Sequence, residues 1–150
     1  MKELNNLFVE QTDKTPLIDF NYFTGELILS GKSIPINAPR IFEPILDWIN
    51  EYIKDPRQTT NLRLNLEYFN TASSIWLAKI VKALTTITKP ECVLFLHIYF
   101  SIEDFEDIDD IKDDLSPVID VISTSTVSVG LKIYGTDDKG KIIKESMIFI

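Results

Sequence analysis

The sequence predicts an α/β fold in which a single domain is built on a mixed β-sheet of about six strands, with helices packed mainly on one face. The chain has 150 residues, 45% of them hydrophobic, which suits one domain with one core. Apolar residues alternate in some stretches and recur at helical spacing in others. The resulting order is hairpin, helix, strand, helix, strand, acidic helix and hairpin. Strand–helix–strand units of this kind imply a parallel centre with right-handed connections.

Hairpins are predicted near both ends of the chain. We expect residues 1–14 to form a loose N-terminal arm of a single domain that spans residues 1–150. From Leu17 the text LIDF, NYFTG and ELILSG predicts two strands joined by a turn at Asn21 and Gly25. Near the C-terminus, alternation from Val127 to Tyr134, the turn GTDDKGK and the final run IIKESMIFI predict a second hairpin.

The first helix is predicted in the text IFEPILDWINEYI. Proline lacks an amide hydrogen, so Pro44 is tolerated only in a first turn or at a kink. The regular helix is therefore expected to start near Phe42 and to end at Asp55-Pro56.

A change of period marks the middle of the chain. Residues 62–69 alternate apolar and polar side chains as a strand does, and helical spacing then runs from Ala72 to about Thr86. Four capping or hydroxyl residues lie at this junction: Asn70, Thr71, Ser73 and Ser74. Asn and Thr at a helix start are ordinary caps. A helix N-terminus also suits a phosphate, because it offers unpaired N–H donors and the positive end of the helix dipole.

Three further segments complete the predicted fold. Residues 92–100 are apolar at nearly every position, which predicts a strand in the middle of the sheet that is covered on both faces. Residues 103–115 predict a short amphipathic helix with an acidic outer face. The text VIDVI at residues 118–122 is interpreted as a short strand or the approach to one.

Composition excludes several classes of function. The net charge is −8, and residues 103–114 contribute −7 of it through eight acids and one base, so no basic patch favours nucleic-acid binding. No apolar run is long enough for a membrane helix, and the N-terminus has no signal-peptide pattern. The lone Cys92 favours a reducing, cytoplasmic setting over a disulfide framework.

No cofactor or metal site is predicted. His97 is the only histidine and is interpreted as a packed or hydrogen-bonded core residue. The chain has no CxxC pair for zinc and no glycine loop for phosphates. The acidic segment lacks EF-hand spacing and is interpreted as a solvated face, with docking of a basic partner or cation binding as the alternatives. We therefore do not expect an enzyme.

Three phrases resemble the SiaC family of regulatory phosphoproteins. EYFNTASSIWL at residues 67–77 resembles the family's phosphoacceptor motif, in which a strand ends in a phrase close to Y-x-N-T-S-S. PRIFEPILDWINEYI at residues 39–53 resembles the family's F-x-P-containing helix. TPLIDFNYFTGELILSGKSIPIN at residues 15–37 is similar to the family's first hairpin. The resemblance covers residues 15 to about 100, in the family's order.

The resemblance implies a STAS-like fold and a cytoplasmic bacterial signalling protein that is not an enzyme. It implies that a serine/threonine kinase and a PP2C-like phosphatase switch the protein, and that the unphosphorylated form binds a diguanylate cyclase. Thr71 maps onto the phosphoacceptor, with Asn70, Ser73 and Ser74 as its motif neighbours. Ala72 departs from the motif, which usually has serine there. We expect the partner surface to include Tyr68, Trp76 and Lys79.

An alternative keeps the interaction module but moves the modified residue. In a module that resembles a STAS-type anti-sigma-factor antagonist, Ser73 or Ser74 would carry the phosphate in place of Thr71. The partner would then be an anti-sigma-like kinase.

Overall fold

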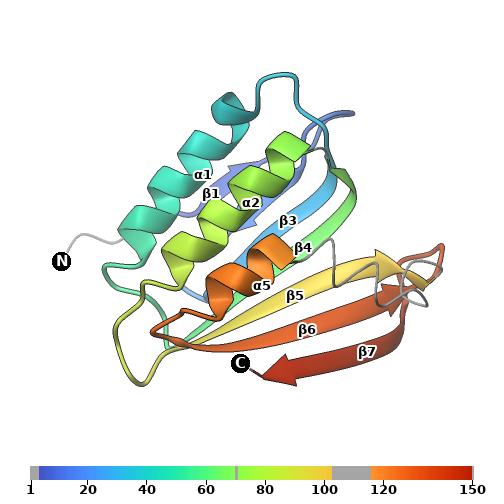
Figure 1. Cartoon of the computed structure of the whole chain (residues 1–150). Helices are drawn as coiled ribbons and strands as arrows, with labels where there is room; N and C mark the ends of the chain where they lie inside the picture. The colour runs from blue at the N-terminus through green and yellow to red at the C-terminus, as the bar shows by residue number, and fades with distance from the viewer. Residues whose placement is uncertain (1–3, 70, 103–115, 150) are drawn as a thin grey trace.

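The computed structural model describes residues 4–69, 71–102 and 116–149, which form a seven-stranded sheet and three helices (Figure 1). The N-terminal half contains β1 (Leu7–Val9), β2 (Leu17–Phe20), β3 (Glu26–Ser33), α1 (Ala38–Tyr52) and β4 (Thr59–Phe69). The C-terminal half contains α2 (Thr71–Leu84), β5 (Val93–Ser101), α5 (Ser116–Ile122), β6 (Ser128–Thr136) and β7 (Ile142–Phe149).

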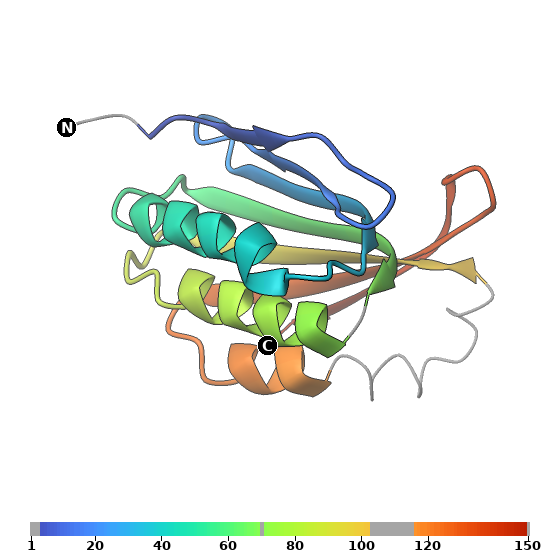
Figure 2. The same ribbon diagram turned by 90° about the horizontal axis from the view of Figure 1, so that it is seen from above.

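The strands lie in the sheet in the order of the sequence, from β1 to β7. β3, β4, β5 and β6 are parallel to one another, whereas β1, β2 and β7 pair antiparallel at the two sides. All three helices lie on one face of the sheet (Figure 2). The predicted mixed sheet, its parallel centre and both terminal hairpins are therefore confirmed.

The seventh strand comes from the segment that was predicted to be a loose arm. Leu7 and Val9 register with Phe20 and Ile18 of β2. The Trp48 indole Nε1 also donates to the Asn5 carbonyl at 2.7 Å. The prediction of a loose arm is thus wrong for this part of residues 1–14, because a three-residue strand is too short to show a period and is held by tertiary contacts.

α1 begins at Ala38, four residues before the predicted start at Phe42. The Asn37 side chain caps the helix by accepting from the Arg40 amide, and a proline occupies the first turn. Pro44 lies inside the helix, on its exposed side. Water can reach the carbonyl that Pro44 leaves without its helical donor, so the helix tolerates this proline in its interior.

The core lies between the sheet and the helices. Leu27, Leu62, Leu94 and Leu131 point from neighbouring strands into this layer and are almost fully buried. β5 occupies a central position, as predicted, but helices cover only one of its faces. Its opposite face carries half-buried side chains at residues 93, 95 and 99, so the prediction of a strand covered on both faces is wrong. Aromatic rings on that face account for the continuous apolar run.

The text VIDVI also differs from its prediction. It belongs to α5, where Val118 and Ile122 are buried one helical turn apart. Pro117 is compatible with the first turn of a helix, so the segment packs on α2 as a helix and not as a strand. The predicted acidic helix over residues 103–115 lies outside the described residues.

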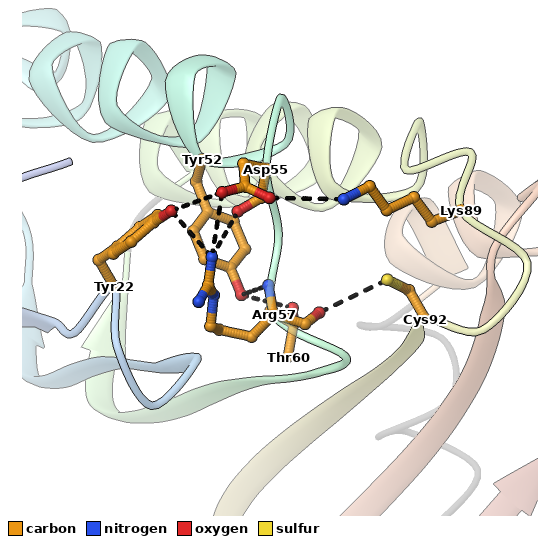
Figure 3. A network of polar contacts seen from close by, with 7 residues as sticks. All are labelled: Tyr22, Tyr52, Asp55, Arg57, Thr60, Lys89 and Cys92. Carbon is orange, nitrogen blue, oxygen red and sulfur yellow. Dashed lines mark hydrogen bonds and ion pairs between the residues drawn. The ribbon is translucent and has the colours of Figure 1, made fainter. Parts of the chain in front are cut away.

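A polar cluster closes one edge of the sheet, where the parallel strands begin (Figure 3). Tyr22 donates to the Asp55 carboxylate at 2.9 Å, Arg57 Nη2 donates to the Tyr22 hydroxyl at 2.8 Å, and Lys89 lies 3.4 Å from Asp55. The hydrogen bond from Tyr22 is the main reason that the pKa of Asp55 is lowered. The cluster joins the first hairpin, the end of α1 and the loop before β5.

Tyr52 lies beside this cluster and is fully buried. Its hydroxyl lies 2.7 Å from the hydroxyl of Thr60, which is also fully buried, and it accepts from the Arg57 amide at 3.2 Å. Burial raises the pKa of Tyr52. The hydroxyl therefore acts as a neutral link between the end of α1 and the start of β4.

A second polar cluster lies on the sheet face that carries no helix. His97 Nδ1 lies 2.8 Å from the Tyr134 hydroxyl, and His97 Nε2 lies 2.7 Å from Asn61 Oδ1. Burial lowers the pKa of His97 to about 4, and the nearby charge of Arg63 acts in the same direction. His97 is 3% exposed, so the prediction of a hydrogen-bonded core histidine is confirmed.

We expect Tyr52→Phe to lower the free energy of unfolding by about 1–3 kcal/mol, because it leaves the buried Thr60 hydroxyl and the Arg57 amide without their partner. Urea denaturation measures this loss. Thr60→Val provides the matched half of a double-mutant cycle. The double variant should lose less than the two single losses added together, because it removes both polar groups. Strict additivity would contradict a direct bond between these side chains.

We also expect His97 to make stability depend on pH. The folded state holds His97 neutral down to about pH 4, whereas the unfolded chain takes up a proton near the ordinary pKa of 6.5. The stabilisation from neutral His97 is therefore complete above pH 6.5 and falls as the pH drops toward 4, by about 3 kcal/mol. Urea denaturation across this window should give a flatter stability profile for His97→Gln. Parallel profiles for the two proteins would contradict this role.

Candidate functional site

The junction between β4 and α2 lies at the edge where the parallel strands end. β4 ends at Phe69 and α2 begins at Thr71, so the single intervening residue is Asn70, which lies outside the described residues. Ser33, the last residue of β3, registers with Phe69. The loop that follows β3 leads into α1, so the N-termini of α1 and α2 lie at the same edge of the sheet (Figures 1 and 2).

Thr71 is the first residue of α2, one residue earlier than the predicted start at Ala72. The helix ends at Leu84, two residues before the predicted end. The first turn contains Ser73 and Ser74, and it has no acidic residue. The N–H groups of a first turn have no partner within the helix, and the helix dipole adds positive potential there. The backbone at this position is therefore suited to an anionic group.

The side chains of Tyr68, Thr71, Ser73 and Ser74 lie outside the described part of the structure, so their predicted roles stay predictions. Trp76 and Lys79 lie within the described part. The Trp76 ring stacks on Phe42 of α1, with the centroids 6.1 Å apart and the planes 10° from parallel. Lys79 Nζ lies 4.4 Å above the centre of the same ring. These contacts bring Trp76 and Lys79 together at the surface between α1 and α2.

Exposed apolar residues lie near this surface, and the sequence interpretation did not include them. Ile75 on α2 is 54% exposed. Ile36, in the loop before α1, is 91% exposed, and Ile34 in the same loop is 38% exposed. The sequence did contain a signal for these exposed residues, because two isoleucines lie in a predicted loop that also contains a proline. Apolar side chains that are this exposed and lie near the N-termini of two helices are typical of a surface that binds another protein.

The charged residues of α2 are all basic. Lys79 and Lys82 are exposed on the helix, and its residues 71–84 include no acid. A chain with a net charge of −8 thus presents two exposed lysines along the C-terminal half of α2. These lysines favour a partner with negative potential.

Among the described residues, no group of three or more His, Cys, Asp or Glu residues could hold a metal ion. Cys92 is buried, and burial raises the pKa of its thiol. No helix in the described ranges is long and apolar enough to cross a membrane.

A hollow of about 520 Å³ lies between the C-terminal end of α2 and α5, and threonines provide much of its lining. Four of the five lining threonines, Thr85, Thr86, Thr124 and Thr126, donate their hydroxyls to nearby carbonyls. Thr85 Oγ1 donates to the Lys82 carbonyl at 2.6 Å, and Thr124 Oγ1 donates to the Val121 carbonyl at 3.1 Å. Carbonyls at helix C-termini carry negative potential, so this hollow does not suit an anionic ligand.

Solved structures share this fold. The crystal structure of apo-SiaC from Pseudomonas aeruginosa matches with a TM-score of 0.63 at 23% identity, over 73% of this chain and 92% of that chain. The crystal structure of the diguanylate cyclase SiaD in complex with its activator SiaC, from the same organism, matches with a TM-score of 0.66 at 20% identity. That match covers 85% of this chain and 99% of the matched chain.

Sequence comparisons agree with the structural ones. An uncharacterised protein of Pseudomonas aeruginosa (strain UCBPP-PA14) is 31% identical over 70 residues, which is 47% of this chain and 56% of that relative. The match thus spans a little over half the length of this relative. The family model described as SiaC family regulatory phosphoprotein matches residues 9–128, which include the β4–α2 junction. The chain therefore belongs to the SiaC family of regulatory phosphoproteins.

Proposed function

We propose that this chain is a non-enzymatic signalling protein that binds a protein partner and is switched by phosphorylation of Thr71. One observation carries the proposal: in a chain of a regulatory phosphoprotein family, the motif threonine is the first residue of α2. The position lies at the edge where the parallel strands end, beside a surface with exposed apolar residues. A covalent change there alters the surface without requiring a change in the core.

A phosphate on Thr71 would add a charge of about −1.5 to −2 to this surface. The unpaired N–H groups of the first turn and the helix dipole would stabilise the modified form of the free protein. A partner that covers the same helix end would have to bury that charge. Burial of an unpaired doubly charged group costs at least several kcal/mol, which is enough to abolish a micromolar complex.

The proposed partner is a diguanylate cyclase, and the unphosphorylated form would promote cyclic-di-GMP synthesis. The solved complex in which SiaC is the activator of the diguanylate cyclase SiaD supports this choice. A cognate serine/threonine kinase and a PP2C-like phosphatase would add and remove the phosphate. All of these partners are expected to act on this chain in the cytoplasm.

The proposed contact surface surrounds the N-terminus of α2. It includes the exposed Ile36 and Ile75, together with Trp76 and Lys79, which contact each other. Tyr68 at the end of β4 is the predicted fifth member. Isoleucines would supply apolar contact, and the lysine would pair with a carboxylate of the partner.

We expect phosphorylated protein, or Thr71→Asp, to bind the cognate cyclase at least about 100-fold more weakly than the unmodified chain, because the new charge must be desolvated. Titration calorimetry with the purified cyclase measures this change. Thr71→Val keeps the site neutral and should retain binding. Equal affinities for Thr71→Asp and the unmodified chain would overturn the switch.

Phosphopeptide mass spectrometry on protein isolated from its host separates Thr71 from its neighbours. We expect the phosphate on Thr71. Modification confined to Ser73 or Ser74 would remove Thr71 from the mechanism and favour the module that resembles an anti-sigma-factor antagonist.

The contact surface can be tested apart from the phosphate. Ile75→Asp places a charge on the proposed apolar contact and should weaken cyclase binding by about tenfold or more. Because Ile75 is 54% exposed, the fold should be retained, and circular dichroism checks this. Phe23→Asp is a matched control. Phe23 is 58% exposed in the turn between β2 and β3, where the parallel strands begin, whereas α2 starts where they end. Equal losses in both variants would contradict a local surface.

A further inference from the structure

The outer faces of α1 and α2 are not covered by any other described segment of the chain (Figures 1 and 2). On α1, Glu43 and Asp47 are exposed and lie one turn apart. On α2, Lys79 and Lys82 are also exposed and about one turn apart. Among the described residues, none of these four makes an ion pair. An acidic row on one helix thus lies beside a basic row on its neighbour.

Both rows point away from the sheet. Successive residues of a helix are rotated by about 100°, so residues two positions apart point in nearly opposite directions. Asp47 lies two positions from the buried Ile45, and Lys82 lies two positions from the buried Ile80. These charges are therefore presented to the surroundings of the molecule and not to its core.

The two rows also lie at similar heights along the helices. α1 and α2 run in the same direction, because each connects two parallel strands. The Trp76 ring stacks on Phe42, which sets the register between the helices. With a rise of 1.5 Å per residue, Asp47 lies about 7.5 Å beyond Phe42, and Lys82 lies about 9 Å beyond Trp76. The acidic and basic rows are thus level within a few ångströms.

Symmetry determines which face-to-face arrangement of two copies joins opposite charges. A two-fold axis parallel to the helices preserves height and places α1 of one copy over α2 of the other. Asp47 then faces Lys82, Glu43 faces Lys79, and each pair forms twice. A two-fold axis that crosses the helices would instead place α1 over α1 and α2 over α2, with like charges opposed. Charge complementarity therefore favours the parallel axis.

We propose that two copies of this chain associate through the outer faces of α1 and α2, about a two-fold axis parallel to these helices. Ile75 is 54% exposed and lies one turn before Lys79 on the same face of α2. At this height it would contact the hydrocarbon stem of Arg40 in the second copy, which keeps that guanidinium about 7 Å from Lys79 along the axis.

The dimer would have a consequence for partner binding. It would cover Ile75 and Lys79, which also belong to the proposed contact surface for the cyclase. Self-association and binding of that partner would then exclude each other. The pairing of two copies itself does not rest on the proposed function, because it follows from the charges and register of α1 and α2.

Sedimentation velocity over a range of protein concentrations tests the association. We expect a monomer–dimer equilibrium for the unmodified chain. Asp47→Lys would place two lysines opposite each other twice, and Lys82→Glu would do the same with two acids. Each variant should raise the dimer Kd by about tenfold or more. A chain that stays monomeric at its highest attainable concentration, or a dimer that neither variant weakens, is incompatible with the proposal.

An equimolar mixture of the two variants provides a rescue. It should form heterodimers with about the affinity of the unmodified dimer, because each cross-pair again joins a lysine and an acid. Asp138→Lys and Lys139→Glu are the matched controls, since both residues are exposed in the turn between β6 and β7. These controls should leave the dimer Kd unchanged. Failure of the mixture to regain the dimer, or an equal loss in the controls, would contradict this arrangement.

Discussion

Parallel pairing of the four central strands is the constraint on which the rest of the structure depends. β3, β4, β5 and β6 run in one direction, so each connection must cross a face of the sheet before the next strand begins. The three helices of the described residues lie on the same face, and α1 and α2 start at the same edge as a result (Figure 2). The site at the N-terminus of α2 is thus a consequence of sheet topology, and Thr71, two residues after the end of β4, begins the helix at its electropositive end.

The sequence predicted the elements in which a periodic pattern of apolar residues continues over many positions. The junction at residues 69–71 could be placed within one residue, since eight alternating positions precede it and a helical stripe follows. Short elements were not predictable in this way. β1 is held by Phe20 and Trp48, which are distant in sequence, and α5 is held by its packing on α2. The exposure of Ile36 depends on the path of the loop after β3, and no local sequence pattern predicts that path.

Family resemblance located Thr71, and the structure supplied the surface around it. Sequence alone left Thr71, Ser73 and Ser74 equivalent as hydroxyl groups near a helix start. The place of Trp76 and Lys79 could not be predicted from the sequence, because it depends on Phe42 of α1. The Trp76 ring stacks on Phe42, and Lys79 lies over the Trp76 ring, at the boundary between the helices. Ala72 remains a departure from the motif, and nothing in the structure explains it. The STAS-like description of the fold stays a prediction.

The arrangement separates stability from signalling. The buried Tyr52–Thr60 pair and the charged cluster around Asp55 lie where the parallel strands begin, whereas α2 starts where they end. The eleven residues of β4 separate the two regions by roughly 35 Å. That distance exceeds several Debye lengths at physiological ionic strength, so a phosphate on Thr71 would have little effect on the Asp55 cluster. The charge of the proposed switch can therefore change while the interactions that hold the sheet edge remain in place.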